Sequence, residues 1–329
     1  MSYNLPSRLD LEDAVKTLAP VVRETPLLRS RALDAIVGCN VLVKPESLQQ
    51  TGSFKLRGAY YRLSRLNDDE RRRGVVAFSS GNFAQGLAAA GSILEVPVTI
   101  VMPIDAPKAK IDATRGWGAA VELTAHGDEP REVVADRRAR EIAKETGAIL
   151  AHPFDDPMIV AGQSTVTVEL LRQAKELGAK LDVILVPVGG GGLLGGCALA
   201  CEHLDPGPKV YAVEPAGYDD FGRSLELGER ISNSDTPKTL CDALQAVRPG
   251  EITFAAAYGR VEGGVAVEDN LVRNAMKLAF DHLKIVLEPS GAITLGAILG
   301  GTLDLQDKTV AVLSCGGNVA LEDFIKLVA

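Results

Sequence analysis

The sequence is poor in the residues on which several common kinds of site depend. Its 329 residues include four histidines, one tryptophan and five cysteines, and no two cysteines form a CxxC pair. We find no HExxH or other zinc spacing and no serine-hydrolase elbow, so zinc and serine-hydrolase sites are not expected. An odd, scattered set of cysteines is typical of reduced thiols, which predicts a cytoplasmic protein.

Positive charge is also scarce. The sequence has 35 Lys and Arg residues and 43 Asp and Glu residues, which gives a formal net charge of -8. Without a basic run, neither nucleic acid nor an anionic membrane is an expected partner. The first eight residues are polar, so no secretion leader is expected. The uncharged run 183–200 is long enough to mimic a membrane span. Six glycines and Pro187 divide it, and we interpret it as a buried strand, a glycine turn and a helix.

Short apolar runs alternate with helical patterns along most of the chain, which predicts an α/β protein with parallel sheets. We expect two doubly wound domains, a large one of residues 1–73 plus 152–329 and a small one of residues 74–151. The expected strands are 41–44, 75–78, 98–101, 120–123, 149–150, 183–187, 210–213 and 309–313. The expected helices are 10–18, 54–66, 83–94, 109–117, 130–146, 159–177, 271–283 and 292–300.

The stretch from Thr51 to Ala59 is centred on Lys55. Gly52 can turn the chain and Ser53 can cap the helix that follows, which places Lys55 in its first turn. The helix dipole disfavours a cation there, so the lysine conflicts with its local setting. A lysine held at this position loses its proton more easily and can act as an amine nucleophile. The alternative is an ordinary solvated charge.

Four consecutive glycines, Gly189 to Gly192, follow one expected strand and precede a helix. Such a turn lets the backbone approach an anion and aims N–H groups at it, with the positive end of the helix behind. No Lys-Ser or Lys-Thr follows, and the spacing does not fit GxGxxG, so one phosphate is a better ligand than two. The alternative is a crowded turn that needs only small residues.

Two further turns follow expected strands. The turn Ser79 to Asn82 suits a carboxylate, although either Ser80 or Asn82 could simply cap a helix. In the turn Ser314 to Asn318, a hydroxyl or thiol could bond a ring nitrogen, and the alternative is again a helix cap.

Glu214, Asp219 and Asp220 form an oxygen-rich acidic loop. Hard cations such as Mg²⁺ or Ca²⁺ prefer carboxylates together with backbone carbonyls. A solvated acidic loop is the alternative interpretation.

These segments occur in one order that resembles the fold-type II pyridoxal-phosphate enzymes, in the branch of threonine dehydratase and serine racemase. The resemblance rests on Ser53–Ala59, Ser79–Asn82, the four glycines and Cys315–Asn318, and it covers about Arg23 to Leu321. Supporting pieces are Glu46–Gln49, His152–Pro157, Ala161–Gln163 and Glu288–Ala292. The resemblance implies two parallel-sheet domains similar to those of tryptophan synthase β, with the cofactor in the large domain, and a homodimer.

The resemblance also implies roles for individual residues. Lys55 is expected to hold pyridoxal 5'-phosphate as a Schiff base and to move the substrate α-proton. Cys315 is expected at the pyridine nitrogen, with Ser314 as second choice. The implied cofactor-binding set is Phe54, Lys55, Asn82, Gly189, Gly190, Gly191, Gly192, Ser314, Cys315 and Glu288. The implied substrate-binding set is Ser79, Ser80, Asn82, Phe83 and Gln163. The implied Mg²⁺ or Ca²⁺ ligands are Glu214, Asp220 and the carbonyl of Tyr218.

Two positions depart from the pattern of the family. Phe83 replaces a histidine, which favours an apolar β-substituent such as an aryl group and weakens the case for a β-carboxylate. Ser164 stands where glycine is common. The expected function is dehydration of β-hydroxy-α-amino acids of the threonine or serine type, or phenylserine, to 2-oxo acids and ammonia.

Three other functions are open at this stage. The first is a serine racemase that uses Ser80 opposite Lys55, and the second is a threo-3-hydroxyaspartate dehydratase. A nucleotide-binding protein without a covalent cofactor is the alternative from another class.

Overall fold

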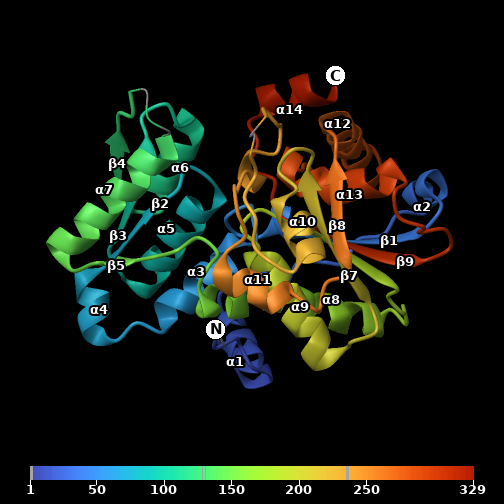
Figure 1. Ribbon diagram of the computed structural model, residues 1–329, viewed down its shortest axis with the longest axis horizontal. Coiled ribbons are helices and arrows are strands. Elements are labelled where there is room, and N and C mark those ends of the chain that lie inside the picture. The colour runs from blue at the N-terminus through green and yellow to red at the C-terminus, as the bar shows by residue number, and fades with distance from the viewer. Residues whose placement is uncertain (1–2, 128, 130, 235–236) are drawn as a thin grey trace. The chain divides into compact units, whose positions relative to one another are not determined.

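The computed structural model describes residues 3–127, 129, 131–234 and 237–329; Pro130, where one helix was expected to begin, lies outside them. The chain forms two compact units, one of Met1–Phe54 with Phe154–Ala329 and the other of Lys55–Pro153. Each unit has its own parallel sheet flanked by helices, as expected from the alternating pattern (Figure 1).

The boundaries of these units differ from those read from the sequence, which assigned residues 55–73 to the large domain. In the structure, helix α3 (Lys55–Ser64) belongs to the small unit because it packs along α5 (Asn82–Leu94). A Cβ added at Gly86 would lie 2.9 Å from backbone atoms of both Lys55 and Leu56. Glycine at this position therefore permits the close approach of the two helices.

The sheet of the large unit has five parallel strands in the order β1-β9-β6-β7-β8. The strands are β1 (Asn40–Pro45), β6 (Val183–Pro187), β7 (Lys209–Pro215), β8 (Gly263–Val267) and β9 (Thr309–Ser314). Successive side chains enter cores on opposite faces: Val41 and Val43 join one cluster, and Leu42 joins the other. Burial of both faces explains why these strands are almost continuously apolar.

Helices cover both faces of this sheet (Figure 1). They are α1 (Arg8–Leu18), α2 (Arg31–Val37), α8 (Pro157–Glu176), α9 (Gly192–Leu204), α10 (Asp220–Leu227), α11 (Glu251–Ala257), α12 (Asp269–Leu278), α13 (Pro289–Gly300) and α14 (Leu321–Val328). The short turns are η1 (Glu46–Leu48), η2 (Asp242–Leu244) and η3 (Ala279–Leu283), of which η3 is a π-helical turn that continues α12. The sequence analysis did not predict β8, α2, α10, α11 or α14, all of eight residues or fewer, whose patterns are too short to read.

The sheet of the small unit has the order β4-β3-β2-β5 and is also parallel. Its strands are β2 (Val75–Phe78), β3 (Val98–Pro103), β4 (Ala120–Thr124) and β5 (Ile149–Leu150). Its helices are α3, α4 (Asp68–Arg73), α5, α6 (Lys108–Gly116) and α7 (Arg131–Thr146). Helix α5 is buried along most of its length, and its small residues bring it close to the sheet.

The uncharged run 183–200 forms β6, the glycine turn and most of α9, as the sequence predicted. No helix in the described part of the chain combines the length and the apolar character that a membrane crossing requires. All five cysteines are buried free thiols.

Candidate active site

The segment that precedes Lys55 is attached to the turn that follows the last strand. The amide of Phe54 donates to the carbonyl of Cys315 over 3.1 Å, and the amide of Gly317 donates to the carbonyl of Gly52 over 2.9 Å. The side chain of Asn318 donates to the carbonyl of Thr51 over 2.9 Å. Since Lys55 directly follows Phe54, these bonds fix the chain at the point where it enters α3.

Ser53 does not cap this helix, contrary to the sequence expectation. Its backbone forms an isolated antiparallel bridge with Gly316. Its buried hydroxyl has no hydrogen-bond partner among the described residues. The expectation was wrong because the backbone of Ser53 pairs with a distant segment.

The ammonium of Lys55 lies in an environment that is partly apolar. Its Nζ is 5.8 Å from the centre of the Phe83 ring and 3.2 Å from the carbonyl oxygen of Pro153. Phe83 is buried, whereas Lys55 is half-buried. Phe83 and Pro153 thus provide an aromatic ring and a hydrogen-bond acceptor beside this amine.

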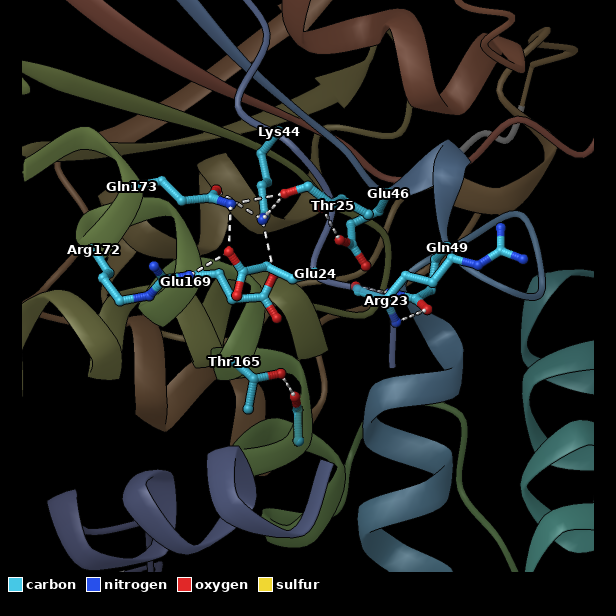
Figure 2. Close-up of polar contacts among 11 residues, drawn as sticks. Arg23, Glu24, Thr25, Lys44, Glu46, Gln49, Thr165, Glu169, Arg172 and Gln173 are labelled. Atoms are coloured by element: carbon cyan, nitrogen blue, oxygen red, sulfur yellow. Dashed lines mark hydrogen bonds and ion pairs between the residues drawn. The ribbon is translucent and has the colours of Figure 1, made fainter. Parts of the chain in front are cut away.

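A second lysine, Lys44, is fully buried and is surrounded by polar acceptors (Figure 2). Its Nζ donates to Thr25 O at 2.7 Å, Glu169 Oε2 at 2.8 Å and Gln173 Oε1 at 3.0 Å. These three acceptors use all the hydrogens of an ammonium group. Lys44 therefore joins β1 to α8 through its ion pair with Glu169 and its hydrogen bond to Gln173. No sequence signal points to this network, because its members are far apart along the chain.

The turn Ser79 to Asn82 leads into α5 without a side-chain cap. The N-cap residue is Gly81, which has no side chain to offer to the first turn of the helix. Ser79 Oγ instead accepts from the amide of Gly81 over 3.3 Å. Neither Ser80 nor Asn82 therefore caps helix α5 with its side chain. The first-turn N–H groups of α5 lack intrahelical acceptors, which suits a carboxylate ligand.

The four-glycine turn is packed closely on its protein side. A Cβ at Gly190 would lie 2.2 Å from the Phe154 ring, and one at Gly191 would lie 2.3 Å from the Phe221 ring. Gly191 also has a φ of +96°, which disfavours other residues. Both positions therefore require glycine for steric reasons alone, as the crowded-turn interpretation predicted.

The same turn also has features that suit an anion. Gly191 is the N-cap of α9, no side chain among the described residues caps this helix, and its first turn begins with Gly192. Its first N–H groups thus lie at a positive helix end and have no side-chain cap among the described residues. This arrangement fits a single phosphate, as expected for the cofactor.

The turn after β9 lies beside the glycine turn, because β6 and β9 are neighbouring parallel strands. The Cys315 thiol donates to the carbonyl of Ser290 over 3.3 Å. The buried Ser314 hydroxyl has no partner among the described residues. The amide of Glu288 donates to the carbonyl of Gly316 over 3.2 Å, so the start of α13 joins this group. The structure thus gathers the expected phosphate and pyridine residues at one edge of the large sheet.

Gln163 and Ser164 are both buried in α8. A Cβ at Gly196 of α9 would lie 2.7 Å from the amide nitrogen of Ser164, so the two helices approach closely at this point. The hydroxyl of Ser164 donates to the carbonyl of Ala161 over 2.6 Å. This bond within its own helix explains how a serine is tolerated where glycine is common.

The acidic residues lie at the end of β7, which contains Glu214, and at the start of α10, which has Asp219 as its N-cap and Asp220 as its first residue. Glu214 accepts from the amides of Phe221 and Gly222, each over 2.8 Å, and Asp220 accepts from the side chain of Asn233 over 2.8 Å. Burial raises the pKa of Glu214 well above its usual range and that of Asp220 to about 6.

The loop therefore holds carboxylates but no dense metal-ligand cluster. The second carboxylate oxygen of Asp220 has no partner within the described ranges. The described residues contain no group of three or more His, Cys, Asp or Glu side chains that could hold a metal. The expected set has only two carboxylates and the carbonyl of the buried Tyr218.

Known proteins resemble this chain over nearly its whole length. The family model "Pyridoxal-phosphate dependent enzyme" matches residues 18–316. L-threo-3-hydroxyaspartate ammonia-lyase of Saccharomyces cerevisiae is 39% identical over 325 residues, covering 99% of this chain and 97% of that protein. Serine racemase of Oryza sativa is 38% identical over 316 residues, covering 94% and 90%. The crystal structure of a threonine deaminase from T.th. gives a TM-score of 0.89 at 42% identity, covering 96% and 99%.

Proposed function

Because the chain belongs to the family of pyridoxal-phosphate dependent enzymes, we propose that it converts β-hydroxy-α-amino acids to 2-oxo acids and ammonia. It is a fold-type II lyase of the threonine and serine dehydratase type. The observation that carries the proposal is the hydrogen bond between Phe54 and Cys315, which attaches the residue before Lys55 to the turn expected at the pyridine ring.

We assign the cofactor contacts residue by residue. Bound pyridoxal phosphate supplies the electron sink for the bond that breaks at the substrate α-carbon. Lys55 would carry it covalently, and the N–H groups of Gly189 to Gly192 would hold its phosphate. Phe54 would contact its ring, Asn82 its hydroxyl and Cys315 its nitrogen. We include Glu288 in this set because its amide donates to the carbonyl of Gly316, next to Cys315.

The substrate contacts follow from the turn before α5. Its N–H groups, with Ser79, Ser80, Asn82 and Gln163, bind the substrate carboxylate. Lys55 is the residue that would take the α-proton as general base. Phe83 contributes an apolar surface near Lys55.

A panel of substrates tests the proposal directly. Release of 2-oxo acid is measured with L-threonine, L-serine, D-serine, threo-3-hydroxyaspartate and phenylserine. We expect turnover of threonine or serine, with phenylserine favoured over hydroxyaspartate because Phe83 offers no polar partner to a second carboxylate. Turnover of none of these amino acids would reject the dehydratase function.

Racemisation of serine is the second candidate function. Serine racemase of Oryza sativa is among the similar proteins. Ser80 is half-buried in the turn before α5, and the N-cap of that helix is Gly81 rather than this serine. A hydroxyl there can return a proton to the α-carbon from the side opposite Lys55. Interconversion of D- and L-serine, measured alongside release of 2-oxo acid, separates the two activities.

A divalent cation at the acidic loop is a further part of the proposal. The unpartnered oxygen of buried Asp220 and the nearby buried Glu214 fit Mg²⁺ or Ca²⁺, with the carbonyl of Tyr218 as third ligand among the described residues. Neutralisation of two buried carboxylates is the physical effect that such an ion would have.

We also propose that the protein is a cytoplasmic homodimer. Free thiols at all five cysteines are consistent with a reducing compartment. Light scattering coupled to gel filtration measures the mass in solution, and a monomer of 34.7 kDa would contradict the dimer.

A further inference from the structure

The motif His152–Pro157 has no role in the function described so far, yet two of its residues contact the support of the glycine turn. The ring of Phe154 packs against Gly190, and Asp155 binds the start of α11. Asp155 Oδ1 accepts from the amides of Ile252 at 2.8 Å and Thr253 at 3.3 Å, and its Oδ2 accepts from the amide of Glu251 at 2.9 Å. One carboxylate therefore fixes the first turn of this helix.

Helix α11 in turn holds one carbonyl of the glycine turn. The hydroxyl of Thr253, which is fully buried, donates to the carbonyl oxygen of Gly190 over 2.6 Å. The amide of Gly250 donates to the same oxygen over 3.3 Å. The Gly190 carbonyl thus points into α11 and is held there by two donors.

This contact determines the direction of the next N–H group. In a trans peptide the C=O and N–H point in opposite directions, so a Gly190 carbonyl directed at Thr253 turns the Gly191 N–H away from α11. Glycines on both sides of this peptide have few barriers to rotation, so the turn does not hold this orientation by itself. An external hydrogen bond is therefore needed to keep the N–H aimed at a ligand.

We propose that Thr253 and Asp155 are positioning residues: Thr253 orients the Gly190–Gly191 peptide toward the cofactor phosphate, and Asp155 holds Thr253 in place through α11. The inference rests on the proposed function, because it takes the glycine turn as the phosphate site. Neither residue touches the cofactor. Their effect is on the affinity for its phosphate group.

The experiment starts from the purified holoenzyme, from which the cofactor is removed by dialysis. The binding of two ligands to the same preparation is then compared. Pyridoxal phosphate and pyridoxal, which lacks the phosphate, are titrated into wild type and variants, and binding is followed by visible absorption. Thr253→Val removes the hydroxyl at constant shape, and Thr253→Ser keeps it. Asp155→Asn weakens the helix cap. Asp156→Asn is the matched control, because Asp156 caps α8 through Met158 and Ile159.

Thr253→Val and Asp155→Asn are expected to weaken pyridoxal phosphate binding roughly two- to tenfold, the effect of one buried neutral hydrogen bond, and to leave pyridoxal binding unchanged. Thr253→Ser is expected to restore wild-type affinity, and Asp156→Asn to keep the wild-type ratio of the two affinities. The ³¹P resonance of the bound cofactor should shift in Thr253→Val but not in Asp156→Asn.

Equal losses of both ligands, or an unchanged affinity for pyridoxal phosphate in Thr253→Val, would overturn the inference. If Thr253→Val does not fold, Asp155→Asn and Thr253→Ser still decide the question. The deciding quantity is the ratio of the affinities for pyridoxal phosphate and pyridoxal. Failure of the proposed function looks different, because wild type itself would then bind the two ligands equally or show no visible absorption with either.

Discussion

The amide of Phe54 lies 3.1 Å from the carbonyl oxygen of Cys315, although the two residues come from opposite ends of the chain. The bridge between Ser53 and Gly316 and the bond from Asn318 to Thr51 support the same contact. The segment that precedes Lys55 is therefore hydrogen-bonded to the turn after β9. Phe54 and Cys315 both belong to the large unit, and their bond holds the residue that precedes Lys55 at the turn after β9.

Lys55 and Lys44 are predicted to have different effects when replaced. Lys55→Ala should abolish the visible absorption of the bound cofactor and the tagging of the chain by borohydride, with little change in the free energy of unfolding. Lys44→Met should keep the absorption but lower the unfolding free energy by about 3 kcal/mol, because the ion pair between Lys44 and Glu169 is lost. Spectra and denaturant titrations check both. An unchanged spectrum in Lys55→Ala would remove the basis of the function.

Phe83 is predicted to set the preference for the β-substituent. Phe83→His should raise kcat/KM for threo-3-hydroxyaspartate relative to phenylserine by roughly tenfold or more, since a polar partner replaces an apolar ring near Lys55. Phe83→Leu is the matched control and should keep the wild-type order. Initial rates of 2-oxo acid release measure the ratio, and the idea is rejected if both variants change it equally.

Ser80 is predicted to be essential for racemisation and to make only a small contribution to dehydration. Ser80→Ala should lower D/L-serine interconversion by about 100-fold, the usual loss of a general acid or base, and leave 2-oxo acid release within a few-fold of wild type. Ser79→Ala, which removes the neighbouring hydroxyl that bonds Gly81, should affect both activities together through substrate binding. A parallel loss of both activities in Ser80→Ala would show that its hydroxyl only binds the carboxylate.

The acidic loop is predicted to respond to divalent cations through Asp220. Mg²⁺ or Ca²⁺ should raise the thermal midpoint of wild type, and a chelator should reverse the effect. Asp220→Asn keeps an acceptor for Asn233, so without cations it should be about 1 kcal/mol more stable than wild type and should not respond to them. Asp219→Asn, a change to the half-exposed partner of Arg223, should still respond. A wild type insensitive to both ions contradicts the site.

Cys315 and Ser314 are predicted to differ in their effect on the pyridine ring. Cys315→Ala should shift the absorption maximum of the bound cofactor and slow turnover, because a neutral donor or acceptor at the ring nitrogen tunes its electronics. Ser314→Ala should leave the spectrum unchanged. A shift caused by Ser314→Ala alone would transfer the role to the hydroxyl, which has no partner among the described residues.

Local patterns in the sequence were sufficient to predict the α/β class, the parallel sheets and most strands of the two units. Strands β2, β5 and β6 were predicted with their observed bounds, because buried parallel strands are short, continuous apolar runs between turns. The family was also evident from sequence, since motifs such as Ser53–Ala59 and the four glycines keep their identity and order. Short elements such as α11 and β8 showed no readable periodicity.

Only the tertiary structure decided what each polar residue is bonded to. It showed that Ser53 pairs with Gly316 rather than capping α3. It also showed that Lys44 forms a buried ion pair with Glu169. It also showed that Asp155 and Thr253 support the glycine turn. The physical reason is that hydrogen bonds depend on distance in space, and the fold brings together groups whose separation along the chain carries no local signal.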